Sequence, residues 1–86
     1  MGMVQYAAPE QVVYSKYDVR SDLYSIGVLM FELLTGAPPF DSNEPIEVMD
    51  MLIKKTPRFL ESSQRNIPIS LQSIVLKALA KNPDDR

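Results

Sequence analysis

Residues 21–36, S-D-L-Y-S-I-G-V-L-M-F-E-L-L-T-G, decide the fold of this 86-residue chain. Apolar side chains fill almost every position in the middle of this stretch, and Glu32 is the single charge there. A surface helix carries one apolar stripe, whereas a helix that is apolar on all sides is buried. Ser21 is a candidate N-cap, and Gly36 can end the helix in the left-handed conformation before Pro38-Pro39. The stretch therefore predicts a central helix with protein packed on every side.

Composition excludes several kinds of site. The chain has no cysteine and no histidine, so disulfides, thiolate metal sites and a histidine general base are excluded. Its net charge is −2 with both signs mixed, which gives no reason to expect nucleic acid or a membrane as a partner. No positively charged leader with an apolar run is visible. We expect a soluble, cytoplasmic polypeptide that forms one small domain or a piece of a larger one.

Two further helices are expected after the central one. Asn43 is a candidate N-cap for a helix with Glu44 and Pro45 in its first turn and its basic end at Lys54-Lys55. Ser70 is the candidate cap of a third helix, which Pro83 would end. Its apolar side chains follow helical spacing at Leu71, Ile74, Val75, Ala78 and Leu79. No segment has a convincing strand pattern, so the sequence predicts an all-α fold.

The remaining segments are predicted to be irregular. Pro9 can open a short helical turn over residues 9–13, and the rest of the N-terminal segment is expected to be a solvated arm. Residues 57–69 show neither helical nor strand period and are expected to form a loop. The apolar anchors expected outside the helices are Phe40, Phe59, Leu60 and Ile67.

The residues themselves predict no catalytic group. No glycine-rich phosphate loop is present, and no cysteine or histidine can serve in a nucleophile–base pair or bind zinc. The pair Asp84-Asp85 is expected to be solvated rather than to hold a metal ion. The chain by itself is therefore expected to have no catalytic residue, no metal site and no bound cofactor.

Four blocks of the sequence resemble the C-terminal lobe of a protein kinase, most closely that of the bacterial serine/threonine kinases. The blocks are A-P-E at 8–10, S-D-L-Y-S-I-G at 21–27, E-L-L-T-G-A-P-P-F at 32–40 and L-K-A-L-A-K-N-P-D-D-R at 76–86. One A-P-E alone has little weight, but four blocks in the family's order over essentially the whole chain are specific. The resemblance implies a partial C-lobe over residues 1–86, with a short helix EF, a buried helix F, then helices G and H, and no sheet.

The resemblance also assigns roles to individual residues. In the family, the glutamate of A-P-E pairs with an arginine that matches Arg86, so Glu10 and Arg86 are expected to form an ion pair; the alternative is two exposed charges that contribute little. The other motif positions are Ala8, Pro9, Asp22 and Gly27. The peptide-substrate loop would comprise Gly2, Met3, Val4, Gln5, Tyr6 and Ala7. Met3 stands where the family usually has Thr or Ser, and its thioether, unlike their hydroxyl groups, cannot donate a hydrogen bond.

The activity implied by the resemblance belongs to a longer protein. The N-lobe, the catalytic loop and the D-F-G segment are absent from this sequence, so ATP and magnesium would bind only in the intact parent kinase. The chain would contribute the peptide-substrate loop and a helical scaffold, and alone it is expected to be inactive. Its partners would be a protein or peptide substrate and the missing remainder of the kinase domain.

Two other functions stay open at the level of sequence. The chain could be a non-catalytic binding module that docks partners through helix 45–55, with Met49 and Met51 on its surface. It could also be an unrelated small helical protein, in which Glu10 and Arg86 would act independently. The kinase resemblance also implies that the segments which cover the central helix are missing here. A large apolar side chain left in water forfeits about 1.5–3 kcal/mol, so we expect the isolated chain to be marginally stable and to self-associate through exposed apolar surface.

Overall fold

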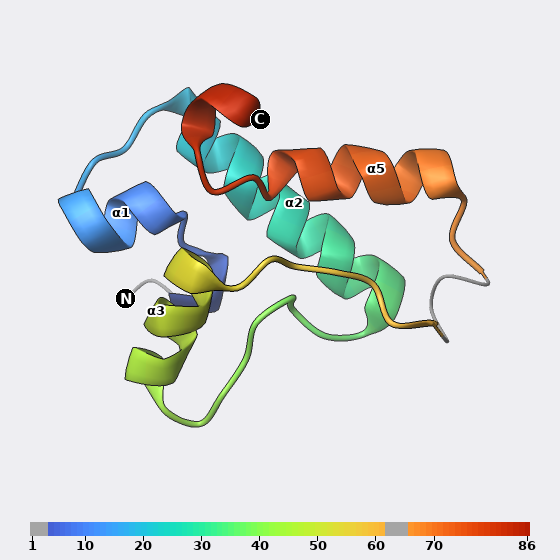
Figure 1. Ribbon diagram of the computed structural model, residues 1–86, viewed down its shortest axis with the longest axis horizontal. Coiled ribbons are helices and arrows are strands. Elements are labelled where there is room, and N and C mark those ends of the chain that lie inside the picture. Colours follow the sequence, from blue (N-terminus) through green and yellow to red (C-terminus); the bar gives the residue numbers. More distant parts are fainter. Residues whose placement is uncertain (1–3, 62–65) are drawn as a thin grey trace.

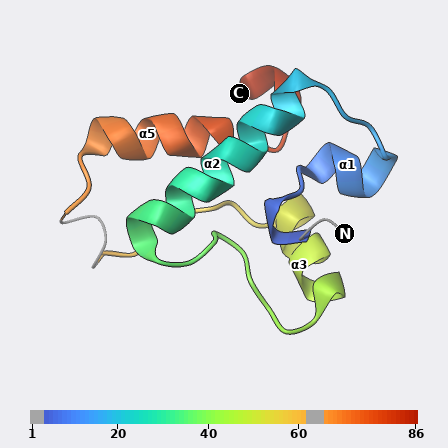
Figure 2. The ribbon, with the colours of Figure 1, turned by 180° about the vertical axis from the view of Figure 1, so that it is seen from behind.

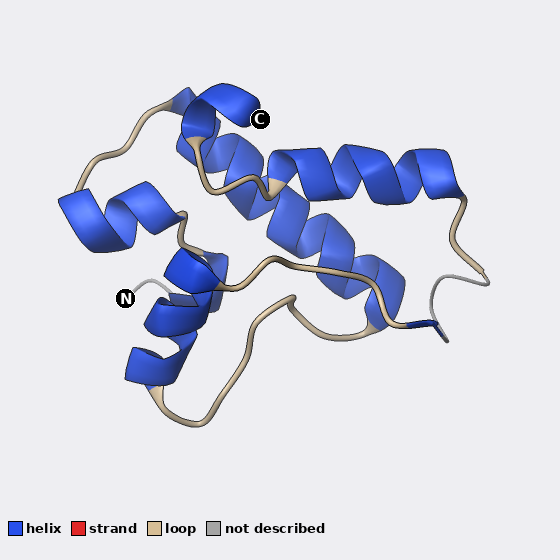
Figure 3. Cartoon of the chain, viewed as in Figure 1, coloured by secondary structure: helices blue, strands red, loops and turns tan. Residues whose placement is uncertain are grey.

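The computed structural model describes residues 4–61 and 66–86. All the regular secondary structure among these described residues is helical, as the sequence predicts (Figure 3). In chain order the elements are the 3-10 helix η1 (Val4–Tyr6), α1 (Pro9–Tyr14), α2 (Val19–Thr35), α3 (Pro45–Lys54), α5 (Ile69–Ala78) and the 3-10 helix η2 (Pro83–Asp85). No helix in the described part of the chain has the length and apolarity needed to cross a membrane.

Helix α2 lies between two groups of elements. Helix α5 packs across it at an angle, and the C-terminal η2 lies beside its first turns (Figure 1). Helices η1, α1 and α3 form a second group near the N-terminus, which Figure 2 shows from behind. The two ends of the chain are therefore both held against α2.

Helix α2 begins earlier than the sequence predicts. Asp18, and not Ser21, is the N-cap, because its carboxylate accepts a hydrogen bond from the Arg20 backbone N–H at 2.7 Å. The Ser21 hydroxyl accepts from the Asp18 backbone N–H at 3.3 Å and so completes a capping box. The predicted end is confirmed, since Gly36 adopts the left-handed conformation with φ of 91°.

The two faces of α2 differ in exposure. Tyr24 and Val28 are fully buried, and Phe31 is 6% exposed. The opposite face is open to solvent, with exposed fractions of 43% for Leu23, 51% for Ile26, 49% for Leu29 and 85% for Leu33. The expectation of protein on every side is therefore wrong for this chain, because the described residues cover one face only.

The buried face of α2 approaches α5 very closely at Gly27. A Cβ placed on Gly27 would lie 2.9 Å from the Ala78 Cβ and 3.1 Å from a methyl carbon of Leu79. Real Cβ atoms essentially never reach 2.9 Å, so a side chain at this position would force the two helices apart. Gly27 therefore sets the distance between α2 and α5.

The other two long helices begin within two residues of their predicted starts. Glu44, not Asn43, is the N-cap of α3, and Pro45 takes the first helical position, where its missing N–H costs nothing. Pro68, not Ser70, is the N-cap of α5. Helix α5 ends at Ala78 instead of running on to Pro83, which begins η2. The ends predicted for α2 and α3, at Gly36 and Lys54, are both found.

The core confirms most of the predicted anchors. Phe40, Phe59 and Ile67 are each at most 6% exposed, and the rings of Phe31 and Phe59 stack with centroids 4.6 Å apart. Two predicted core residues are exposed, Leu60 at 67% and Ile74 at 61%, because Phe59 and Val75 occupy the inward positions beside them.

The N-terminal segment is not the solvated arm that the sequence pattern predicts. Ala8 is fully buried and Pro9 is buried at the start of α1, because η1 packs on both α2 and α3. The short helix predicted to open at Pro9 is present. This packing brings the segment before Glu10 against the central helix.

Candidate functional site

The most enclosed ion pair among the described residues joins α1 to the C-terminal residue Arg86. The Arg86 guanidinium and the Glu10 carboxylate form two parallel hydrogen bonds, Nη1 to Oε2 at 2.7 Å and Nη2 to Oε1 at 2.9 Å. Their side chains are 0% and 11% exposed, respectively. The ion pair implied by the kinase resemblance is thus present and buried, and the alternative of two exposed charges is excluded.

Arg86 is further held by the elements around it. Its guanidinium donates to the backbone carbonyl oxygen of Arg20 at 2.9 Å and to that of Ala80 at 2.9 Å. It also lies over the ring of Tyr24, 4.9 Å from the ring centroid, which is a cation–π geometry. A planar guanidinium with five donors can satisfy all these partners at once, which an ammonium group cannot.

Glu10 has a second donor besides Arg86. The Ser21 hydroxyl donates to Oε2 of Glu10 at 2.7 Å, which links α1 to the first turn of α2. Burial by itself would raise the pKa of Glu10, but the hydrogen bonds from Arg86 and Ser21 outweigh it and lower the pKa from 4.5 to about 2. Glu10 is therefore a charged structural carboxylate at neutral pH, not a proton donor.

Tyr24 completes this cluster on the α2 side. Its hydroxyl oxygen is fully buried and has no hydrogen-bond partner among the described residues. Burial raises the pKa of Tyr24, so the phenol stays neutral. Its ring, not its hydroxyl, makes the contact with Arg86.

The predicted peptide-substrate loop is partly described. Gly2 and Met3 lie outside the described residues, while Val4, Gln5 and Tyr6 form η1 and Ala7 follows it. The Tyr6 hydroxyl donates to the Glu32 carboxylate at 2.6 Å, and its backbone carbonyl accepts from the Ser25 hydroxyl at 2.7 Å. The Glu32 hydrogen bond is the main cause that raises the pKa of Tyr6. Two points on α2 thus hold this segment in place.

Asp22 does not join the ion-pair cluster. It lies in the exposed first turn of α2, where its carboxylate accepts a hydrogen bond from the Tyr17 hydroxyl. An acid in the first turn also interacts favourably with the positive end of the helix dipole.

The described residues contain no cluster of metal-ligating side chains. Within residues 4–61 and 66–86, no group of three or more acidic or metal-ligating side chains could hold a metal ion. The sequence contains no glycine-rich loop for phosphates.

These features define a helical protein whose two ends are fastened to a central helix by a buried carboxylate–guanidinium pair. The protein kinase domain family matches the chain over residues 1–86. This chain therefore belongs to the protein kinase domain family and corresponds to the helical part of a serine/threonine kinase.

Individual relatives support the same assignment. Serine/threonine-protein kinase PknB of Mycobacterium leprae is 43% identical over 88 residues, which cover the whole of this chain and 14% of that protein. Serine/threonine-protein kinase PksC of Streptomyces coelicolor is 37% identical over 86 residues, again the whole of this chain and 16% of that protein. The chain thus spans about one seventh of the length of the relatives that it matches.

Sequence reasoning missed two members of the cluster. The sequence predicts Ser21 only as a helix cap, whereas its hydroxyl donates to Glu10, and the sequence pattern gives Tyr24 no role of its own. A signal was available for Tyr24, because it lies three residues after Ser21 and therefore on the same helix face. No local pattern indicates that Arg86, at the far end of the chain, reaches Glu10 and Tyr24.

Proposed function

We propose that this chain serves as the peptide-binding loop and helical scaffold of a serine/threonine protein kinase, whose intact form phosphorylates protein substrates with ATP and magnesium. The catalytic groups come from kinase segments outside residues 1–86, so this chain alone transfers no phosphate. ATP as the phosphate donor favours a cytoplasmic site of action.

One observation carries the proposal. The buried pair between Glu10 and Arg86 fastens the segment before Glu10 to the end of the helical lobe. A substrate loop must hold one shape while a peptide binds, because ordering it during binding would cost affinity. The hydrogen bonds of Tyr6 to Glu32 and from Ser25 supply further anchors for the same segment.

The exposed face of α2 supports the scaffold role. Large apolar side chains on one face of a helix favour a protein partner, since contiguous exposed apolar surface marks interaction sites. We propose that the remainder of the kinase domain covers this face. In its absence, the same face makes the isolated chain self-associate.

A segment exchange tests the proposed function. Residues 1–86 replace the matching segment in the kinase of Mycobacterium leprae that is 43% identical to this chain. We expect the chimera to phosphorylate a protein substrate within about tenfold of the parent rate, a change of about 1.4 kcal/mol in the barrier. We expect no phosphate transfer from the 86-residue chain under the same conditions.

The controls separate folding from function. The chimera with Glu10→Gln should lose stability and activity, whereas Asp50→Asn, at an exposed carboxylate paired with Lys54, should leave both unchanged. A chimera that unfolds cooperatively and binds nucleotide like its parent, yet transfers no phosphate, would overturn the proposal.

A second candidate function has its own observation. Helix α3 exposes an apolar stripe at helical spacing, with Ile46 76%, Met49 37% and Ile53 43% exposed, which would suit a docking module. The second predicted contact, Met51, is half-buried against the core and less accessible. A partner whose capture is lost in the Ile46→Gln and Met49→Gln variants, and kept in Met51→Leu, would support docking; capture unaffected by all three would exclude it.

A further inference from the structure

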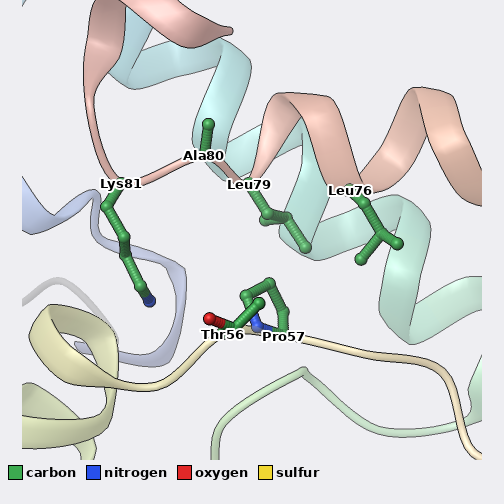
Figure 4. A pocket seen from close by; sticks show the side chains of 6 residues that line it. All are labelled: Thr56, Pro57, Leu76, Leu79, Ala80 and Lys81. Atoms are coloured by element: carbon green, nitrogen blue, oxygen red, sulfur yellow. The ribbon is translucent and has the colours of Figure 1, made fainter.

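Two hollows lie on either side of the irregular segment that follows α3. The first has a volume of about 250 Å³ and is mainly apolar; Thr56 and Pro57 line it together with Leu76, Leu79, Ala80 and Lys81 from the end of α5 and the turn after it (Figure 4). The second has a volume of about 490 Å³ and is lined by Pro39, Phe40, Lys55, Thr56, Pro57 and Arg58. Both contain Thr56 and Pro57, so the two hollows are adjacent, and together they are called the groove below.

Three cationic side chains line this groove. Lys55 and Arg58 belong to the second hollow, and Lys81 lies at the edge of the first. None of the three forms an ion pair with any residue in the described ranges 4–61 and 66–86. The chain as a whole carries a net charge of −2, so this is a local excess of positive charge on an acidic protein.

Several other basic side chains of the described chain are paired with carboxylates. Arg20 pairs with both Asp18 and Asp84, and Lys54 pairs with Asp50 one helical turn away. Lys55 is the immediate neighbour of Lys54, yet it has no such carboxylate beside it. Lys16 and Lys77, outside the groove, also form no ion pair with a described residue, so what distinguishes the groove is that three unpaired cations line it together.

Lys81 is the most enclosed of the three cations. Its Nζ lies 4.4 Å from the centroid of the Phe40 ring and donates to the Met51 carbonyl oxygen at 3.4 Å. Burial, with a smaller contribution from the positive charge of Arg86, lowers the pKa of Lys81 to about 8. A half-buried ammonium with only neutral partners gains more from an added carboxylate than an exposed one does, because water screens it less.

We propose that this groove docks a short peptide segment of a partner protein, in which an apolar side chain is followed by acidic side chains. The apolar side chain occupies the first hollow, against Leu76 and Leu79. The volume of this hollow equals that of about eight water molecules in the liquid. The acidic side chains pair with Lys81, Lys55 and Arg58. The proposal does not depend on phosphate transfer.

Fluorescence anisotropy with a labelled peptide tests this. The probe carries one leucine followed by two glutamates, and its matched control carries two glutamines instead. We expect the glutamate peptide to bind at least tenfold more tightly than the glutamine peptide, and to lose this advantage in high salt. Both the 86-residue chain and the kinase chimera are titrated, so that the groove is measured in two folded contexts.

Variants then assign the contacts. Lys81→Met should weaken binding of the glutamate peptide about tenfold, while Lys81→Arg, which keeps the charge, should retain most of it. Lys55→Met and Arg58→Met should each weaken it about two- to fivefold, as expected for exposed pairs. Lys16→Met, an exposed lysine in the loop before α2, should change nothing.

Three results would overturn the proposal. Equal affinity for the glutamate and glutamine peptides would remove the role of the cations. Amide shifts in a nitrogen-15 spectrum that centre on Ile46 and Met49, instead of on 55–58 and 76–81, would place the peptide on α3. Hexanoate binding as tightly as the whole peptide would make the groove a site for small carboxylates.

Discussion

The two faces of α2 have similar hydrophobicity and very different surroundings. The inner face approaches α5 at Gly27, buries Val28 and carries the Tyr24 ring against Arg86. The outer face presents Leu23, Ile26, Leu29 and Leu33 to solvent. The inner face is closely fitted to residues of this chain, whereas the outer face has no partner among those described.

This difference shows that the apolar character of a side chain predicts that burial would be favourable, but not which segment buries it. Hydrophobic free energy depends on the area removed from water and has no direction. The inner face is distinguished by features that do depend on geometry: a glycine at the closest approach and a serine whose hydroxyl faces Glu10. The outer face has large side chains without such fitting.

Among changes to the inner face, replacing Arg86 should lower the stability of the chain most. Arg86→Met leaves the Glu10 carboxylate buried and without its main donor, so we expect the free energy of unfolding to fall by about 3–5 kcal/mol. Urea unfolding followed by circular dichroism measures this change. The matched control is Arg58→Met, because Arg58 is exposed; its effect should stay within about 0.5 kcal/mol.

A double-mutant cycle sharpens this result. Glu10→Gln combined with Arg86→Met should cost clearly less than the two single losses added together, because each removes the partner of the other. Strictly additive losses would show that the two side chains act independently.

Acid should lower the free energy of unfolding by a somewhat smaller amount than Arg86→Met does. The pKa of Glu10 is about 2 in the folded chain and near 4.5 in the unfolded chain, so the stabilisation is fully present above pH 4.5. As the pH falls towards 2, the unfolded state takes up a proton that the folded state does not, and stability decreases by on the order of 2–3 kcal/mol. Melts across this range should show the decrease in the natural chain, and a smaller one in the Glu10→Gln variant.

Gly27→Ala tests how closely the inner face is packed. Alanine would gain up to about 1 kcal/mol of helix propensity, but overpacking against Ala78 and Leu79 costs about 1–3 kcal/mol. We expect a net loss of about 1 kcal/mol, measured by thermal unfolding. A gain in stability would mean that α5 can move away freely at this point.

The outer face should give the smallest change in stability. Leu33→Gln, at a side chain that is 85% exposed, should change the free energy of unfolding by no more than about 0.5 kcal/mol. Combined with Ile26→Gln, it should also reduce self-association, which sedimentation velocity measures. The buried control is Leu52→Gln, at a fully buried position of α3, which should unfold the chain. A large stability loss from Leu33→Gln would show that this face is covered after all.

Much of the fold could be predicted from the sequence where a local rule applies. Gly36 ends α2 because only a residue without Cβ adopts a φ of 91° at little cost, and Pro9 opens α1 because its φ is preset for a helix. The buried pair of Glu10 and Arg86 was expected only through the resemblance to protein kinases. No local rule connects residues so far apart in the chain.

Several of the predictions that were wrong concern choices between neighbouring candidates. Asp18 and Ser21 can both cap a helix, and Ser21 is the residue whose hydroxyl is needed by Glu10 of another helix. Phe59 and Leu60 are both apolar, and the stacking partner Phe31 selects Phe59. Such choices depend on contacts with distant residues, which a sequence pattern does not contain.

The sequence by itself determined that the chain is helical, that its central helix is strongly apolar and where that helix ends, because these follow from side-chain chemistry within one or two turns. Only the tertiary structure decided which face of α2 is buried, how Arg86 reaches Glu10, Arg20 and Tyr24 together, and that three cations gather along one groove. The physical reason is that burial, close packing and electrostatic neutralisation are properties of pairs of segments, and the chain must fold before those pairs exist.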